Sequence, residues 1–238
     1  MADLSANPDN LVPFLELLTS NQKANIAKFP APYDLIRRVN ICLSTGGRNL
    51  INPNPVMAGV LFLRCQYAYK AAAGMALAGQ VVETFVMMRS CLEYAGYALA
   101  MFQDPALESV FMSRHMSAQE MQLQKQRFRI SEVKKVIVTF DAKLADAFND
   151  LYERSIDFGG HPNPHAAMSA VEMPADALFN RSFTAFALST DEKVLRHAMR
   201  SVAQVGLATL FIFQHIFKSK FELLGIRAEM DRLRRENL

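Results

Sequence analysis

The chain has 238 residues, of which 51% are hydrophobic and 21% are charged, so it can bury a sizeable core. Its formal net charge of +3 is too small to indicate a nucleic-acid-binding protein by charge balance alone. Trp is absent, whereas Met occurs 13 times and Phe 17 times, which favours packed helices because these side chains fill irregular gaps. We therefore expect a single all-α domain over residues 1–238.

No stretch of the chain predicts secretion or membrane insertion. The first ten residues, MADLSANPDN, lack the basic and apolar regions of a signal peptide. The longest uncharged run, Ser201 to Phe217, is shorter than the about 20 residues that a membrane span needs. It also contains Gln204 and His215, which favours a buried core helix. We therefore expect no membrane partner.

The cysteines indicate the redox environment. Cys42, Cys65 and Cys91 lie within predicted helices and show neither CxxC nor Cys/His spacing. Buried free thiols are typical of a reducing compartment, where disulfides are rare. We therefore predict a cytoplasmic protein.

Apolar residues recur at helical spacing along most of the chain, and turn residues separate the periodic stretches. We predict an up-and-down bundle of about seven to nine helices, because the connections are short. The core is expected from 56–78, 81–103 and 190–218, and a charged C-terminal helix within 220–238 needs a partner surface in its own chain or another. Further helices are predicted at 10–19, 32–43, 106–129, from 131 onward, and at 141–158.

Glycine, proline and fading periodicity indicate three interruptions. The stretch STGGRNLINPNP at 44–55 is predicted to be a connector; contact of its backbone N–H groups with an anion is the alternative. Gly79 is predicted to cap the helix before it, so that 56–78 and 81–103 fold into an αα-hairpin. The helical period fades over 166–187, which predicts a short extended excursion there.

Two charges stand near the middle of the largely apolar stretch VVETFVMMRSCLEYAGYALAMFQ at 81–103. Arg89 and Glu93 are four positions apart, so they share one helix face. In an antiparallel hairpin that turns at Gly79, Arg64 lies opposite this level, so the three charges are expected to cluster. Two interpretations stay open: a buried ion-pair network that sets helix register, or the polar floor of a pocket.

The segment RSIDFGGHPNPH at 154–165 joins a helix end to a rigid Gly/Pro loop, and such loops often carry sites. In one interpretation it only ends the helix, and its histidines cap neighbouring carbonyls. In a second, Asp157, His161 and His165 bind a metal, although the prolines remove the helical face that would give this spacing meaning. In a third, Arg154 holds a phosphate and His161 acts as general acid or base on a phosphodiester.

The third interpretation has a counterpart in a known family. Arg154 and His161, at R-x6-H spacing at a helix end in an all-helical chain, resemble the motif of the HEPN ribonucleases. Proteins of that family are helical bundles, and many of them form dimers that bring two such motifs together. They cleave RNA without a metal and are common in toxin–antitoxin and phage-defence systems, so the resemblance implies the same fold and activity here. It covers 12 residues, and it departs from the usual motif at Ser155 and at the two glycines before His161.

A broader resemblance spans about 100 residues. The stretches RCQYAYKAAAGMALAGQ at 64–80, RSCLEYAGYAL at 89–99 and GGHPN at 159–163 are similar to bacterial all-helical proteins of no established activity. The resemblance implies one shared site rather than scattered charges. The ligand-binding residues expected on this basis are Arg64, Arg89, Glu93 and His161, together with the neighbouring His165.

Two functions follow as hypotheses. The first is a binding or interaction protein whose Arg/Glu/His centre holds an anionic small molecule or is purely structural. The second is a metal-independent ribonuclease that uses Arg154 and His161 as catalytic residues. The chain contains no GxSxG, HExxH or GxGxxG motif, so no other enzyme class is indicated, and we expect neither a metal nor a cofactor. The expected partners are an anionic ligand or RNA, and a second copy bound through helical surfaces.

Overall fold

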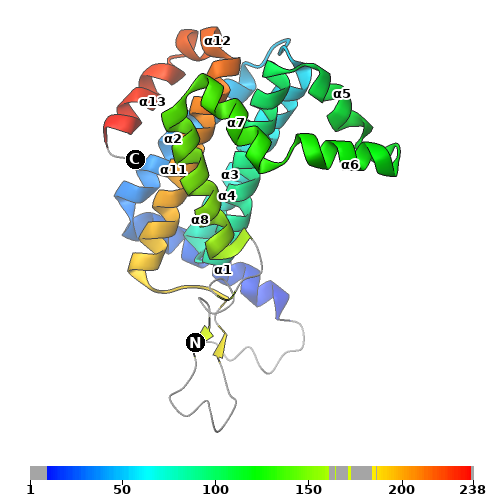
Figure 1. Ribbon diagram of the computed structural model, residues 1–238. Coiled ribbons are helices and arrows are strands. Elements are labelled where there is room, and N and C mark those ends of the chain that lie inside the picture. Colours follow the sequence, from blue (N-terminus) through cyan, green and yellow to red (C-terminus); the bar gives the residue numbers. More distant parts are fainter. Residues whose placement is uncertain (1–9, 161–163, 165–170, 173–183, 186, 237–238) are drawn as a thin grey trace.

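The computed structural model consists of helices packed side by side around a central group, which confirms the predicted all-α bundle (Figure 1). It describes residues 10–160, 164, 171–172, 184–185 and 187–236. The helical elements in chain order are α1 (Leu11–Lys28), α2 (Pro30–Arg48), α3 (Val56–Ala78), α4 (Val81–Gln103), α5 (Ala106–Met112), η1 (Ser113–His115), α6 (Ala118–Arg127), α7 (Ile130–Phe140), α8 (Ala142–Ser155), η2 (Ile156–Gly160), α11 (Glu192–Ile216), α12 (Lys218–Leu223) and α13 (Ile226–Arg235).

The three long helices α3, α4 and α11 form the centre of the bundle, as the sequence predicts (Figure 1). α3 and α4 run antiparallel because Gly79 ends α3 in the left-handed conformation, with a φ of 92°. The N–H of Ser189 donates to the carbonyl of Gly79 at 2.9 Å, which ties the approach to α11 to this turn. Small buried side chains such as Ala72 and Ala95 allow the long helices to approach closely.

A second layer of helices covers this centre. α2 lies against α3 and α11, α7 and α8 cover α4, and α13 packs on α2 and α11. The side chains of Val39 from α2, Ile137 from α7 and Phe148 from α8 have no exposed surface. These helices wrap the three long ones, as expected, whereas α6 makes its main contacts with α5 and η1 and projects from the bundle (Figure 1).

The helices are more numerous than predicted. The described residues contain eleven α-helices, against about seven to nine expected from the sequence. The predicted helix at 106–129 is divided, because Ser117 caps α6 by accepting a hydrogen bond from the N–H of Glu120. The predicted C-terminal helix is divided at Gly225, which has a φ of 69°.

The prediction of a loop over 44–55 is wrong in its first part, because α2 continues to Arg48. Gly46 faces Phe62 of α3, and a Cβ atom at Gly46 would lie 2.7 Å from the end of the Phe62 ring. Gly46 therefore serves close packing of two helices, and a local Gly signal does not distinguish such packing from a turn.

α1 extends to Lys28, beyond the predicted end at 19, because polar side chains anchor its second half. The side-chain amides of Asn21 and Asn25 donate to the carbonyls of Ala78 and Leu77 at 3.2 and 2.8 Å. Carbonyls at the end of a helix lack intrahelical donors, so side chains from α1 complete the end of α3.

Two short strands pair within the range where an extended excursion is expected. Val171–Glu172 (β1) runs antiparallel to Thr184–Ala185 (β2), with Val171 opposite Ala185. Residues 166–170 and 173–183 lie outside the described part of the chain.

The charged C-terminal helix α13 buries its apolar face within its own chain. Ile226, Met230 and Leu233 are buried, and the helix contacts α2 and α11. Arg38 of α2 holds α13 in place, because its guanidinium lies 2.6 Å from a carboxylate oxygen of Glu229 and 2.6 Å from one of Glu236. A second chain is therefore not required to cover this face, and self-association stays a prediction.

None of the helices in the described part of the chain is long and apolar enough to cross a membrane. The uncharged run Ser201–Phe217 lies almost wholly in α11. Its residues Val205, Leu210 and Phe213 are buried, as predicted for a core helix.

Gly206 of α11 provides a test of this packing. A Cβ atom there would lie 2.3 Å from the Tyr69 ring and 2.5 Å from Cγ1 of Val39. We expect Gly206→Ala to lower the free energy of unfolding by about 1–3 kcal/mol through overpacking, as measured by urea unfolding followed by circular dichroism. The control is Gly74→Ala, where the nearest atom is the Gln22 amide nitrogen at 3.5 Å. Equal stability of the two variants would contradict the close contact.

Candidate functional site

Arg89 and Glu93 form the expected ion pair on the side of α4 that faces α8. The Nε atom of Arg89 lies 2.9 Å from Oε1 of Glu93. The hydroxyl of Tyr152, from α8, donates to the same oxygen at 3.0 Å. The Arg89 guanidinium also lies 5.5 Å from the centroid of the Tyr152 ring. These three side chains form a closed contact that joins α4 to α8.

The pKa shifts follow from this arrangement. Burial and the negative charge of Glu93 raise the pKa of Tyr152 to about 12. The same two causes raise the pKa of Tyr97, one turn further along α4, to about 12. Burial acts to lower the pKa of Arg89, but hydrogen bonding and charge pairing with Glu93 outweigh it, and the pKa is raised. At neutral pH both tyrosines therefore carry their protons and Arg89 is charged.

Arg64 does not take the place that the hairpin geometry predicts. Its guanidinium lies 5.8 Å from the centroid of the Tyr94 ring, and its side chain is exposed. Glu93 and Tyr94 are consecutive on α4 and so point about 100° apart around the helix. Arg64 and Arg89 therefore lie on different sides of α4, so the predicted cluster of Arg64 with Arg89 and Glu93 is wrong, and Tyr152 is the third residue of the observed contact.

The segment after α8 is anchored against the start of α4. Gly159 in the π-helical turn η2 lies so close to α4 that a Cβ atom would be 2.2 Å from the carbonyl oxygen of Val82. The Phe158 ring stacks on Phe85 with centroids 5.2 Å apart. His161 and His165 lie outside the described residues, so their predicted roles stay predictions.

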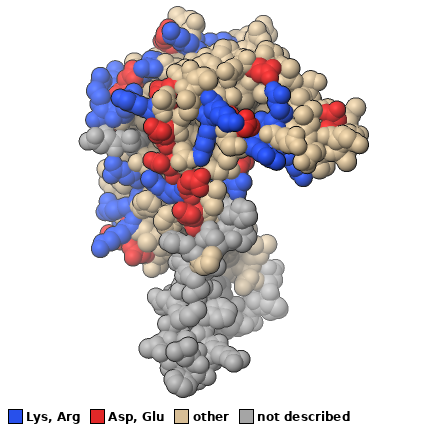
Figure 2. All heavy atoms as spheres, in the orientation of Figure 1, with Lys and Arg blue, Asp and Glu red and all other residues tan. Residues whose placement is uncertain are grey.

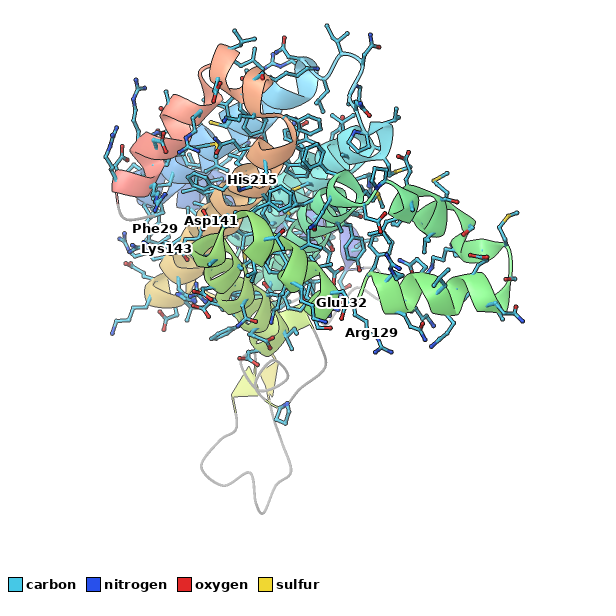
Figure 3. All side chains as sticks on the ribbon, turned by 45° about the horizontal axis from the view of Figure 1, so that its top comes forward. Phe29, Arg129, Glu132, Asp141, Lys143 and His215 are labelled. Carbon is cyan, nitrogen blue, oxygen red and sulfur yellow. The ribbon has the colours of Figure 1, made fainter. Side chains whose placement is uncertain are left out.

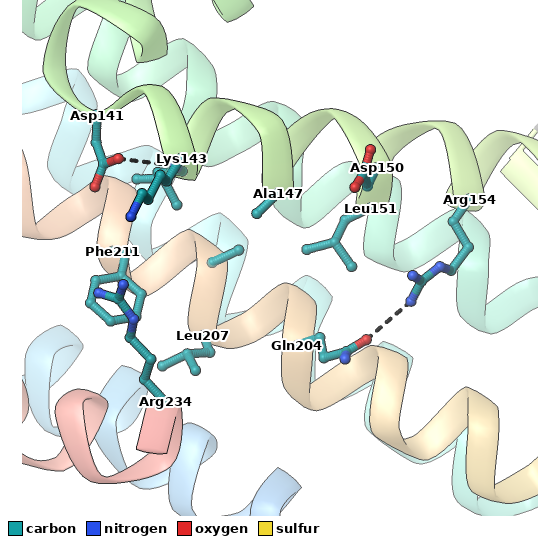
Figure 4. A pocket seen from close by; sticks show the side chains of 12 residues that line it. Asp141, Lys143, Ala147, Asp150, Leu151, Arg154, Gln204, Leu207, Phe211 and Arg234 are labelled. Atoms are coloured by element: carbon teal, nitrogen blue, oxygen red, sulfur yellow. Dashed lines mark hydrogen bonds between the residues drawn. The ribbon is translucent and has the colours of Figure 1, made fainter. Parts of the chain in front are cut away.

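Arg154 lies at one end of a groove of about 330 Å³ between α8 and α11, and Arg234 of α13 lines its other end (Figure 4). We call this the α8–α11 groove. Leucine, alanine and phenylalanine side chains form much of its floor. The lining residues are Asp141, Lys143, Leu144, Ala147, Asp150, Leu151, Arg154, Gln204, Leu207, Ala208, Phe211 and Arg234.

Arg154 is partly buried and donates a 3.0 Å hydrogen bond from Nη1 to the side-chain oxygen of Gln204. Figure 4 shows its guanidinium directed at Gln204, with the carboxylate of Asp150 apart from both. Among the described residues, no carboxylate forms an ion pair with Arg154. A guanidinium with a neutral partner beside an apolar floor retains donors for an anionic ligand.

The opposite end of the groove carries Lys143 and Arg234. The Arg234 guanidinium lies 5.9 Å from the centroid of the Phe211 ring. The nearby carboxylate of Asp141 caps α8 by accepting a 3.0 Å hydrogen bond from the N–H of Leu144. Figure 3 shows Asp141 and Lys143 together at the start of α8.

His197 is a further polar group near Arg154 that the sequence did not single out. It lies on α11, two turns before Gln204, with its ring 5.9 Å from that of Phe158 and 6.4 Å from that of Phe85. Partial desolvation and the positive charge of Arg154 lower its pKa, so this imidazole is neutral at neutral pH. It therefore adds a polar side chain but no charge near the Arg154 end of the groove.

The sequence pointed to only part of this site. Arg154 was selected as a catalytic candidate, whereas Lys143, Gln204 and Arg234 were not selected. The sequence did contain one signal for Gln204, because it places a polar amide within the largely apolar run of α11. No local sequence pattern connects Arg234 with Arg154, because Arg234 reaches the groove only through the packing of α13 on α11.

No group of three or more His, Cys, Asp or Glu side chains within the described residues could hold a metal ion. No family model matches this chain, and no curated protein or solved structure does so either. The resemblances to bacterial helical proteins and to HEPN ribonucleases therefore stay predictions.

The pKa of Tyr152 predicts how stability depends on pH. An unfolded chain loses the tyrosine proton near pH 10, whereas the folded protein keeps it to about pH 12. The stability that neutral Tyr152 contributes is therefore complete below pH 10 and is lost as pH rises through the folded pKa. We expect the stability of Tyr152→Phe to fall less steeply than that of the wild type across this window, as measured by urea unfolding at several pH values.

The control for this measurement is Tyr67→Phe, because Tyr67 is 61% exposed and lies outside the contact. It should reproduce the wild-type slope. Identical slopes for Tyr152→Phe and the wild type would show that Tyr152 is not buried beside Glu93.

Proposed function

We propose that this protein binds a small anionic molecule with an apolar body in the α8–α11 groove. The observation that carries the proposal is the environment of Arg154, which is partly buried and has the neutral Gln204 as its hydrogen-bond partner. The groove volume of about 330 Å³ is at the lower end of the range for small-molecule sites, which is about 300–1,000 Å³.

The chemistry of Arg154 favours a planar or tetrahedral anion. A guanidinium can donate two parallel hydrogen bonds to a carboxylate, sulfonate or phosphate. These bonds strengthen where the neighbouring surface excludes water, as Leu151 and Leu207 do here. The apolar floor would be covered by the body of the ligand, so affinity and orientation come from different parts of the site.

In this proposal, the Arg89–Glu93–Tyr152 contact positions α8 and does not touch the ligand. None of its three residues lines the groove. Both oppositely charged groups already have partners, and removing either partner to accommodate a ligand would leave a partly buried charge unpaired. In this proposal, the ligand-binding role expected from the sequence does not apply to Arg64, Arg89 or Glu93. It stays a prediction for His161 and His165.

We further propose a cytoplasmic location. Its support is that Cys42, Cys65 and Cys91 are free and buried. Free thiols persist where glutathione and thioredoxin keep them reduced.

A metal-independent ribonuclease is the second candidate. It is favoured by the same observation, because an Arg154 guanidinium without a carboxylate partner among the described residues is able to hold a phosphate. The face of the protein drawn in Figure 2 has no broad basic surface for RNA, because Lys and Arg are interspersed there with Asp and Glu. This observation counts against the ribonuclease.

Titration with anilinonaphthalene sulfonate, a fluorescent amphipathic anion, tests the binding proposal. We expect Arg154→Gln to weaken its binding about tenfold or more, because a hydrogen bond to a charged group contributes about 1.5–3 kcal/mol. Arg64→Gln, which changes an exposed arginine outside the groove, should bind as the wild type does. Equal affinity of all three proteins, with circular dichroism confirming that they are folded, would contradict the proposal.

An RNA-cleavage assay without added metal tests the second candidate. If the protein is a ribonuclease of this type, the wild type cleaves RNA, and His161→Ala and Arg154→Ala abolish cleavage. Equal cleavage by wild type and His161→Ala would exclude the mechanism. Binding of the dye that depends on Arg154, with no cleavage by the wild type, would leave the first candidate alone.

A further inference from the structure

The α8–α11 groove has cationic side chains at both ends. Arg154 lies at one end, and Lys143 and Arg234 lie at the other, with apolar side chains between them (Figure 4). Arg154 and Lys143 are eleven positions apart on the same helix, which corresponds to about 16 Å along the axis at about 1.5 Å per residue. The site is therefore elongated, and its two charged ends are too far apart to hold one small anion together.

The cations at the Lys143 end are not neutralised by ion pairs within the described part of the chain. Among the described residues, neither Lys143 nor Arg234 forms an ion pair, whereas Arg227, on the same helix α13, pairs with Asp231 at 2.8 Å. Asp141 lies at this end, but its carboxylate also caps α8. Two cations against one capping carboxylate leave an excess of positive charge.

The acidic residue nearer the other end is Asp150, which is exposed. Figure 4 shows its carboxylate apart from the guanidinium of Arg154. Arg154 and Gln204 thus form a hydrogen-bonded polar pair at one end of the apolar floor. The floor itself, which includes Ala147 and Leu207, is apolar, and Asp150 is the one charged lining residue between the two ends among the described residues.

We propose that the ligand is an elongated dianion with a hydrocarbon body, such as an α,ω-dicarboxylate. One carboxylate is held by Arg154 and Gln204, the other by Lys143 and Arg234, and the hydrocarbon body covers the floor between them. This inference rests on the proposed function, and it adds the shape and charge of the ligand.

Other ligand classes match the groove less well. A fatty acid with one carboxylate would leave one cationic end without an anion. An uncharged lipid would leave both ends without one and would desolvate Arg154 with no compensating charge. A ligand with its phosphates grouped at one end would place several negative charges beside one cationic end and none at the other. Charge complementarity at both ends therefore favours the two-headed anion.

Isothermal titration calorimetry with dodecanoate and dodecanedioate tests the inference, because the two acids differ in one terminal carboxylate. We expect the dicarboxylate to bind the wild type about five- to tenfold more tightly, since exposed ion pairs contribute modestly. Lys143→Gln should reduce this preference, and Lys143→Gln combined with Arg234→Gln should abolish it. Arg154→Gln should weaken both acids. Lys125→Gln, an exposed lysine on α6, is the matched control and should retain the preference.

The outcomes separate this inference from the proposed function. Equal binding of the two acids by the wild type, or no binding of either, overturns the dianion, as does a preference that survives in the double variant. Binding of anilinonaphthalene sulfonate that depends on Arg154 would still support an anion site in those cases. If Arg154→Gln changes the binding of neither the dye nor the two acids, both the dianion inference and the proposed function are overturned. Circular dichroism of the double variant, compared with Lys143→Gln alone, shows whether loss of Arg234 disturbs α13.

Discussion

The carboxylate of Glu93 accepts hydrogen bonds from Arg89 on its own helix and from Tyr152 on α8, and the orientation of α8 depends on this contact. Tyr152 and Arg154 are two positions apart, so they point about 200° apart around the helix. Because Tyr152 is directed at α4, Arg154 must point to the other side, where α11 lies. Gly159 then brings the end of this segment against the backbone of Val82, which a side chain would prevent.

The two arginines near this contact have different electrostatic environments. Arg89 is paired with a carboxylate, and that pairing keeps its pKa high despite burial. Arg154 shares its hydrogen bond with the amide of Gln204 at the end of an apolar groove. A paired charge stabilises the helix contact, whereas a charge with a neutral partner can be stabilised further by an anion. The division between structure and ligand binding proposed here follows from that difference.

The elements with strong local signals were predicted well. The bounds of α3 and α4 match the expected 56–78 and 81–103. The turn between them was predictable because the local sequence is enough to recognise Gly79 as a helix cap. The end of α2 was not predicted, because Gly46 is required by the ring of Phe62 on another helix. Arg64 was placed by counting residues across the hairpin, and that count gives the level along the helix but not the direction in which a long side chain points.

The sequence by itself determined the helical class, the central hairpin and the Arg89–Glu93 pair. Each of these depends on residues within a few positions of one another, where helical periodicity and capping chemistry act. Only the tertiary structure decided that Tyr152 completes the ion pair and that Arg154 meets Gln204 of α11, fifty positions along the chain. Those contacts depend on how α8 is rotated between α4 and α11, and that rotation is set by the Tyr152–Glu93 contact together with packing across the core.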